Sequence, residues 1–154
     1  MTIYDNVALS PRLRGISNRD ELNVIVERCL RRAALWDEVK ARLKSLGSLL
    51  SGGQQQRAAI ARTLVQKSDI ILADEPVASL DPAAADKVMK TLTQINQEDN
   101  ATIIISLHQI EYALKYCTRI IALKGGELIF DGSSGDTSPD FFTDLYGGAI
   151  DMED

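Results

Sequence analysis

The sequence is poor in the residues that build metal centres and disulfide frameworks. Among its 154 residues it has one histidine and two cysteines, Cys29 and Cys117. Both cysteines fall inside helix-like patterns and without the spacing of metal ligands, so we expect two buried free thiols. Neither a zinc centre nor a disulfide scaffold is expected.

Long hydrophobic runs are also missing. No apolar run approaches the roughly 20 residues that a membrane-spanning helix needs, and the first residues lack the basic and then apolar layout of a signal peptide. We therefore expect a cytoplasmic protein. Hydrophobic residues make up 45% of the chain and charged residues 25%, which is typical of one globular domain.

The charge of the chain is acidic and unevenly distributed. The formal net charge is −5, yet residues 1–50 carry nine basic and six acidic side chains, against eight basic and sixteen acidic in the remainder. Nucleic-acid phosphates repel so acidic a body, so DNA and RNA are not expected as partners.

The first part of the chain is predicted to be α-helical. Apolar residues recur at helical spacing over residues 17–34, with Ser17 as the expected N-cap. A short helix is expected over residues 36–43. A third runs from residue 54 to about residue 66, with Ser51 near its start.

Strands and helices alternate after that point. Residues 70–73 are a continuous apolar run, typical of a buried strand in a parallel sheet. Residues 102–107 are expected to form a second buried strand. Asp81 and Pro82 predict the N-cap and first position of a helix. The buried stripe of this helix is expected to consist of Val88, Met89, Leu92 and Ile95. Further expected elements are a helix at residues 110–116, a strand at 119–124, a turn at 125–126, a strand at 127–130 and a short helix at 138–145.

This order of elements predicts an α/β fold. Helices would flank a mostly parallel sheet, beside an α-helical part at the N-terminal end.

Two stretches carry residues suited to phosphate chemistry. Residues 51–54 (SGGQ) place a hydroxyl and two glycines at the start of a helix, where free N–H groups and the helix dipole attract phosphate. Asp74 and Glu75 end an apolar strand, and adjacent carboxylates suit a metal ion and an attacking water.

These stretches resemble the signature and Walker B motifs of ABC-type ATPases. Residues 50–54 (LSGGQ) match the signature, residues 70–74 match Walker B, and Glu75 matches the adjacent catalytic carboxylate. The D-loop is matched by Ser79, Leu80 and Asp81, and the switch histidine by His108. The resemblance covers Thr2 to about Gly147 and implies a partial P-loop NTPase-like ABC ATPase domain.

The resemblance implies a role in ATP hydrolysis for the signature residues. In this family two nucleotide-binding domains meet head to tail, and the signature of one touches the γ-phosphate of the ATP held by the other. The residues that would act in this way are Ser51, Gly52, Gly53 and Gln54. Glycine is expected there because a Cβ would keep the backbone from the phosphate.

Roles for the other motif residues follow from the same resemblance. Asp74 would hold Mg²⁺ through water, and Glu75 would act as general base on the attacking water. His108 would sense the γ-phosphate. Asp81 would cap its own helix and link the two sites of the dimer.

Finer matches are similar to bacterial importers of phosphorus oxyanions. Residues 2–7, 11–15 and 31–44 look like the ATPase subunit of phosphate importers. Residues 72–82, 106–109 and 130–132 look like that of phosphonate importers, and this second match is the longer.

The importer resemblance implies partners, a location and a division of the chain. The expected partners are a second nucleotide-binding domain, integral membrane permease subunits and, indirectly, a periplasmic solute-binding protein. The translocase would lie on the inner face of the cell membrane. Residues 1–50 would be the permease-docking helical part, residues 51–147 the signature helix and C-terminal part of the α/β core, and residues 148–154 a tail.

The phosphate loop of the family does not occur in these residues, because no G-x-x-x-x-G-K-[ST] is present. The resemblance places that loop and the Q-loop glutamine ahead of residue 1. We therefore expect a C-terminal part of an importer ATPase that turns over little ATP by itself. Two alternatives are a non-enzymatic fragment that binds a permease or partner ATPase domain, and an ABC-type chromosome or DNA-repair ATPase. The latter fits less well because long heptad coiled coils are missing.

Overall fold

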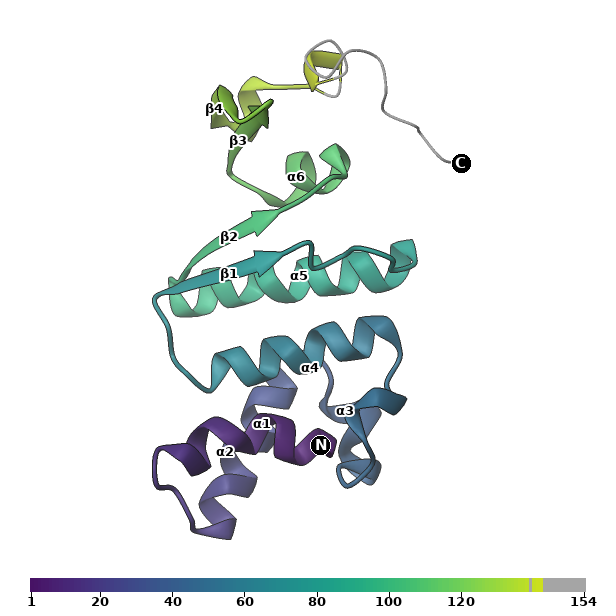
Figure 1. The fold of residues 1–154 in the computed structure, drawn as a ribbon, viewed down its shortest axis with the longest axis vertical. Helices are drawn as coiled ribbons and strands as arrows, with labels where there is room; N and C mark the ends of the chain where they lie inside the picture. The colour runs from purple at the N-terminus through teal and green to yellow at the C-terminus, as the bar shows by residue number, and fades with distance from the viewer. Residues whose placement is uncertain (139, 143–154) are drawn as a thin grey trace. The chain divides into compact units, whose positions relative to one another are not determined.

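The computed structural model describes residues 1–138 and 140–142. The chain divides into two compact units, Met1–Ser106 and Leu107–Asp154 (Figure 1). Within the described residues, none of the helices is both long enough and apolar enough to cross a membrane.

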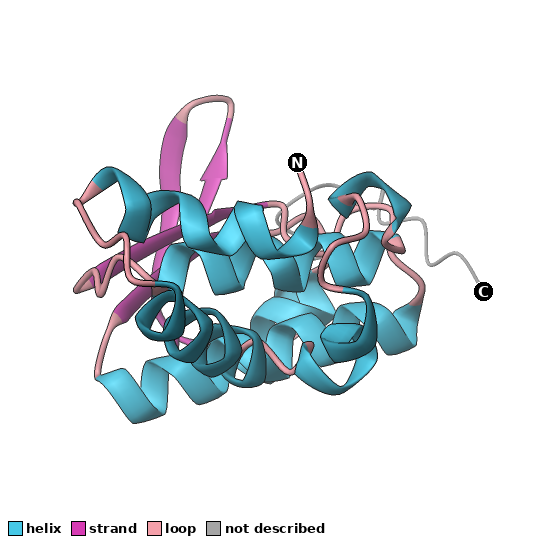
Figure 2. Ribbon diagram, turned by 90° about the horizontal axis from the view of Figure 1, so that it is seen from below, coloured by secondary structure: helices cyan, strands magenta, loops and turns pink. Residues whose placement is uncertain are grey.

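The first unit begins with a group of helices (cyan in Figure 2) that share one apolar core. Helix α4 packs against α1, α2 and α5, and apolar residues such as Val7, Leu30 and Ala61 are fully buried between the helices. The helical segments are α1 (Ile3–Leu13), α2 (Arg19–Arg32), α3 (Trp36–Val39), η1 (Lys40–Arg42), η2 (Gly47–Leu49) and α4 (Gly52–Leu64).

Two predicted helix boundaries in this region are wrong. Helix α2 is capped by Asn18 and not by Ser17, because the Asn18 side chain accepts the N–H groups of Asp20 and Glu21 at 2.9 and 3.0 Å. The α-helix expected over residues 36–43 ends at Val39 and continues as the tighter 3₁₀ turn η1. Helix α1, capped by Thr2, was not predicted as a helix.

A parallel strand pair and a long helix complete the first unit. Strand β1 (Ile70–Asp74) pairs in parallel with β2 (Thr102–Ser106), and α5 (Pro82–Asp99) connects them. The helix start is confirmed, since the Asp81 carboxylate accepts the N–H of Ala84 at 2.9 Å and Pro82 occupies the first turn. The predicted stripe Val88, Met89, Leu92 and Ile95 is buried throughout.

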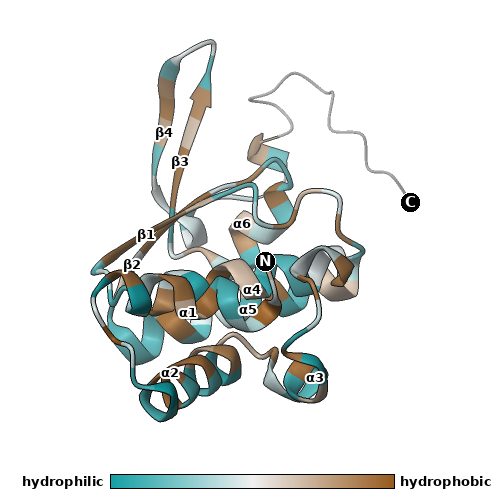
Figure 3. Cartoon of the chain, turned by 60° about the horizontal axis from the view of Figure 1, so that its bottom comes forward, coloured by the Kyte–Doolittle hydropathy of each residue, from teal (hydrophilic) through white to brown (hydrophobic). Residues whose placement is uncertain are grey.

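The prediction that β1 and β2 are buried strands is wrong for one of their two faces. Ile71 and Ile103 pack against the core, whereas Ile70, Leu72 and Ile104 are 59%, 75% and 57% exposed. Alternate strand residues point to opposite faces, and no layer of the first unit's described residues covers the second face. The strands are strongly apolar (brown in Figure 3), so this open face is a hydrophobic surface.

The second unit contains a short helix and a hairpin. Helix α6 (Ile110–Tyr116) precedes β3 (Arg119–Lys124), β4 (Glu127–Ser133) and η3 (Ser134–Asp136), and β3 pairs antiparallel with β4. Gly125 and Gly126 form the predicted turn, with φ values of 59° and 85° that suit glycine. The α/β class is therefore confirmed, and its strands form one parallel and one antiparallel pair in the described chain.

The cysteines and the C-terminal residues were also subjects of prediction. Both cysteines are free as predicted; Cys29 is buried and Cys117 is partly buried, and burial raises the pKa of each thiol. The helix expected at 138–145 lies partly outside the described residues, which show helical backbone at 140–142. The tail expected at 148–154 lies outside them entirely.

Candidate functional site

The start of α4 is a helix N-terminus built by a capping box. The Ser51 hydroxyl accepts the N–H of Gln54 at 3.4 Å, and the Gln54 side-chain oxygen accepts the N–H of Ser51 at 3.1 Å. A serine hydroxyl that accepts one bond still has its own O–H to donate. Ser51 and Gly52 are exposed, so this helix end faces solvent.

Both glycines of residues 51–54 lie against the segment that begins α5. A Cβ on Gly52 would lie 3.0 Å from Leu80 Cδ2, and one on Gly53 would lie 2.9 Å from Ala84 Cβ. The second distance is shorter than real Cβ contacts. Packing within the chain therefore requires glycine at position 53, in addition to the phosphate contact that the sequence suggested.

The two carboxylates Asp74 and Glu75 stand at the carboxyl end of β1. Asp74 is directly opposite Ser106 in the parallel register. The Ser106 hydroxyl donates to Asp74 Oδ1 at 2.6 Å and accepts the backbone N–H of Glu75 at 2.9 Å. One hydroxyl thus fixes the carboxylate of the first acid and the backbone of the second.

The turn after β1 contains two residues in the left-handed region. Glu75 has φ 45° and Ser79 has φ 60°, a conformation that costs a non-glycine residue on the order of 1 kcal/mol or more. The N–H of Ala78 donates to the Glu75 carbonyl at 3.1 Å, and that of Leu80 to the Val77 carbonyl at 3.3 Å. Strain of this kind is often found at functional sites.

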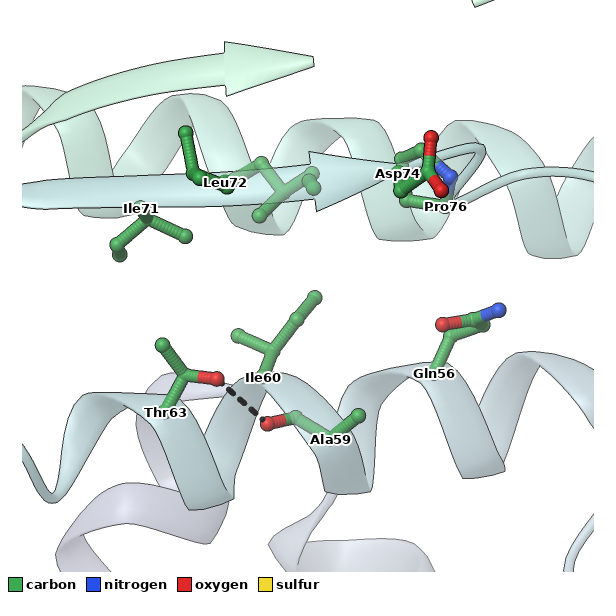
Figure 4. Close-up of a pocket in the computed structure, with 10 residues that line it drawn as sticks. Gln56, Ala59, Ile60, Thr63, Ile71, Leu72, Asp74 and Pro76 are labelled. Carbon is green, nitrogen blue, oxygen red and sulfur yellow. Dashed lines mark hydrogen bonds between the residues drawn. The ribbon is translucent and has the colours of Figure 1, made fainter. Parts of the chain in front are cut away.

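A small cavity lies between α4 and β1 (Figure 4). Its volume is about 160 Å³, below the range of about 300–1,000 Å³ that is usual for pockets enclosing a small-molecule ligand. The lining residues come mainly from the two elements: Gln56, Ala59, Ile60, Thr63, Ile71, Leu72, Ala73, Asp74, Pro76 and Leu92. This cavity does not enclose a nucleotide.

The predicted site residues divide between the two units. Residues 51–54, Asp74, Glu75 and the segment Ser79–Asp81 belong to the first unit, and His108 belongs to the second. In the first unit the structure joins residues 51–54 to Leu80, and Asp74 to Glu75 through Ser106. His108 is exposed and lies two residues after the end of β2.

The structure adds residues that the sequence did not single out. Arg57 is buried, and its guanidinium donates to both carboxylate oxygens of Glu38 at 2.8 and 3.1 Å. Its hydrogen bonds outweigh the opposing effect of burial and, together with those from Lys87 and Gln54, lower the pKa of Glu38 to about 2. No local pattern marks Glu38, which lies 19 residues before Arg57. The contribution of Ser106 could have been predicted from the sequence. A polar residue at the end of an apolar strand lies beside the end of the neighbouring parallel strand.

Comparison with known proteins decides the family. A family model described as "ABC transporter" matches residues 1–78, about half of the chain. The chain belongs to the ABC transporter family.

Curated relatives agree with this ABC transporter assignment. The phosphonates import ATP-binding protein PhnC 2 of Pseudomonas savastanoi pv. phaseolicola is 46% identical over 98% of this chain and 56% of its own length. PhnC 1 of Pseudomonas aeruginosa is 47% identical over 98% of this chain and 55% of its own length. The chain therefore spans about half the length of the curated relatives it matches.

A solved structure shows the same fold. A dimeric ATP-binding cassette in a post-hydrolysis state, bound to ADP and Pi, matches 87% of this chain and 57% of its own, with 36% identity and a TM-score of 0.74.

Proposed function

We propose that this chain supplies the signature, Walker B and switch residues of a composite ATP site in an ABC importer. The observation that carries the proposal is the pairing, in one compact unit, of a capped helix N-terminus at Ser51 with the ordered acids Asp74 and Glu75. The phosphate loop would come from outside these 154 residues. ATP would then lie between that phosphate loop and the signature residues of this chain.

The signature residues would act on the γ-phosphate. The first N–H groups of an α-helix have no intrahelical acceptor and attract anions. Ser51 and Gly52 present this end of α4 to solvent, and the Ser51 O–H adds a further donor. Gly53 and Gln54 would stabilise the conformation of this turn. Gly53 would do so by packing against Ala84, and Gln54 through the capping box.

The acids would act on the metal and the water. The donor set suits Mg²⁺, which prefers oxygen ligands and binds through one or two carboxylates together with substrate phosphates. Asp74 would hold the ion through water, and Mg²⁺ would neutralise charge on the phosphates. Glu75 would accept the proton of the attacking water, in an orientation that the Ser106 bond to its backbone N–H helps to set.

The remaining motif residues would connect the site to its surroundings. His108 would contact the γ-phosphate as the switch residue. Ser79, Leu80 and Asp81 would form the D-loop that faces the partner domain, while Asp81 also caps α5.

The names of the relatives support phosphonate as the solute of the importer, with phosphate as the other candidate. The proposed partners are a second nucleotide-binding domain, membrane permease subunits that dock on residues 1–50, and a periplasmic solute-binding protein. Residues 51–147 would contribute to the ATPase core, and the protein would lie on the cytoplasmic face of the membrane. The solved cassette supports the domain pairing, because it is a dimer bound to ADP and Pi.

The direct test mixes the chain with a polypeptide that carries the family's phosphate loop and measures ATP hydrolysis. The mixture should hydrolyse ATP, and Glu75→Gln should lower turnover at least about a hundredfold because the general base is lost. Asp69→Asn, an exposed acid just before β1, should leave turnover unchanged. If Glu75→Gln turns over as fast as the wild type, the assigned mechanism is wrong. Saturable binding without any turnover would instead favour a purely binding role.

A further inference from the structure

The carboxylate of Glu38, on α3, joins three helices. It accepts two hydrogen bonds from Arg57 of α4, at 2.8 and 3.1 Å, and one from the Gln54 side-chain amide at 2.9 Å. It also forms an ion pair with Lys87 of α5. The Arg57 side chain is only 6% exposed, that of Glu38 31% and that of Lys87 47% exposed, so the Arg57 end of this network is shielded from solvent and the Lys87 end is open to it.

The same side chains hold the backbone of residues 51–54. Gln54, bound to Glu38, accepts the N–H of Ser51 through its side-chain oxygen. Arg57 donates through Nε to the Gly53 carbonyl at 3.2 Å and through Nη1 to the Ala34 carbonyl at 2.6 Å. Two positions of the signature turn are thus tied to one carboxylate through one intermediate side chain each.

The network also reaches the helix that packs on the signature glycines. Lys87 lies on α5, the helix whose first turn contains Ala84, the neighbour of Gly53. Charge-assisted bonds to a carboxylate are about twice as strong as neutral ones, and a buried guanidinium that loses its partner is left strongly destabilised. Loss of the Glu38 charge should therefore weaken the hydrogen bonds and the ion pair that join α3 to both α4 and α5.

We propose that Glu38 is a positioning residue that sets the signature turn, residues 51–54, against α5 and so fixes its fit to the γ-phosphate. This role rests on the proposed function. Glu38 does not touch the nucleotide; it acts through Gln54 and Arg57. Its carboxylate stays ionised at neutral pH because its pKa is about 2.

The test compares Glu38→Gln with a matched control, Asp99→Asn. Asp99 lies at the other end of α5 and pairs with Arg32 of α2 at 2.6 Å, so its loss also breaks an ion pair between helices. Amide hydrogen exchange is measured on the chain itself. Turnover is measured in the mixture with the phosphate-loop polypeptide.

Glu38→Gln should speed exchange at the Ser51 and Gln54 amides, which are hydrogen-bonded in the capping box, about tenfold relative to amides in the middle of α5. In the mixture it should lower kcat about tenfold with little change in KM, because the signature contact would be made most fully in the transition state. Asp99→Asn should lower thermal stability yet leave both readouts unchanged. Lys87→Gln, which removes only the exposed member of the network, should shift both readouts in the same direction by a smaller factor.

The inference is overturned if Glu38→Gln lowers stability without altering amide exchange at Ser51 and Gln54 or kcat. If Glu38→Gln fails to fold, the inference is overturned by a Lys87→Gln variant whose amide exchange and kcat are unchanged. Absence of turnover in the wild-type mixture would count against the proposed function alone, because the exchange experiment needs no nucleotide.

Discussion

Ser106 illustrates how much of the candidate site depends on single polar side chains. Its hydroxyl contacts the Asp74 carboxylate and the Glu75 N–H at once. One contact holds the Asp74 carboxylate, and the other holds the backbone of Glu75, whose φ of 45° lies in the left-handed region.

Ser106→Ala removes the hydroxyl and with it both contacts. The expected loss of unfolding free energy, measured by urea titration, is about 2 kcal/mol, because two hydrogen bonds with a usual net value of about 1 kcal/mol each are lost. In the mixture with the phosphate-loop polypeptide, the Mg²⁺ concentration for half-maximal turnover should rise. Ser106→Thr keeps the hydroxyl and suits a strand, so it should restore both values. Equal behaviour of the alanine and threonine variants would show that the hydroxyl is not used.

The ionised Glu38 predicts a specific pH dependence of stability. Its pKa is about 2 in the folded chain against an ordinary value of 4.5, so the folded state binds this proton less readily than the unfolded chain. The stabilisation is therefore complete above pH 4.5 and is lost as the pH falls toward 2.

Urea unfolding of the wild type and Glu38→Gln, compared over this range, isolates the effect from other acids with lowered pKa values, such as Asp5 and Asp131. The difference between the two proteins should shrink steadily below about pH 4.5. A difference that stays constant down to about pH 3 would contradict the ion-pair assignment.

At the scale of elements, the starts of helices were the most predictable features. Asp81 and Pro82 lie next to the helix that they begin, and the capping box at Ser51 needs only the next three residues. Such signals are local and can be seen in the sequence. The α5 start was therefore placed correctly, whereas the helix expected from residue 54 begins two residues earlier, at Gly52, with Ser51 as its cap. The cap of α2 was placed one residue early because Ser17 and Asn18 are both good N-caps.

Contacts between distant residues could not be predicted in the same way. The bond from Ser106 to Asp74 spans 32 residues and the Glu38 network spans up to 49. Which face of β1 and β2 is covered depends on neighbouring layers and not on the strand residues themselves. A mainly apolar strand such as residues 102–105 has the same sequence pattern whether other layers of the protein cover one face of its sheet or both faces.

The open face of β1 and β2 predicts self-association of the chain. Leu72 and Ile104 are register partners on this face, and an exposed apolar strand surface favours pairing with another molecule. Leu72→Thr combined with Ile104→Thr should weaken self-association at least about tenfold in sedimentation velocity.

The matched control for this pair is Val24→Thr, a 65% exposed residue on α2. It should leave self-association unchanged. Unfolding free energies of these variants should stay within about 0.5 kcal/mol of the wild type, as is usual for surface positions. The open face is not the contact surface if the double variant associates as readily as the wild type.

At the scale of the whole molecule, the proposed function gives the chain one side of a nucleotide site. The signature turn and the acids Asp74 and Glu75 are formed and held in the first unit. The cavity beside Asp74 is too small for a nucleotide. The proposed function therefore requires a second polypeptide that brings the phosphate loop and its bound ATP.

The most direct test of this claim is whether the γ-phosphate holds the two polypeptides together. The Glu75→Gln chain, which lacks the proposed general base, is mixed with the phosphate-loop polypeptide. The dissociation constant is measured by analytical ultracentrifugation with Mg²⁺ and either ATP or ADP. The account predicts binding at least about tenfold tighter with ATP, a difference of about 1.4 kcal/mol. Equal affinity with ATP and ADP would contradict it.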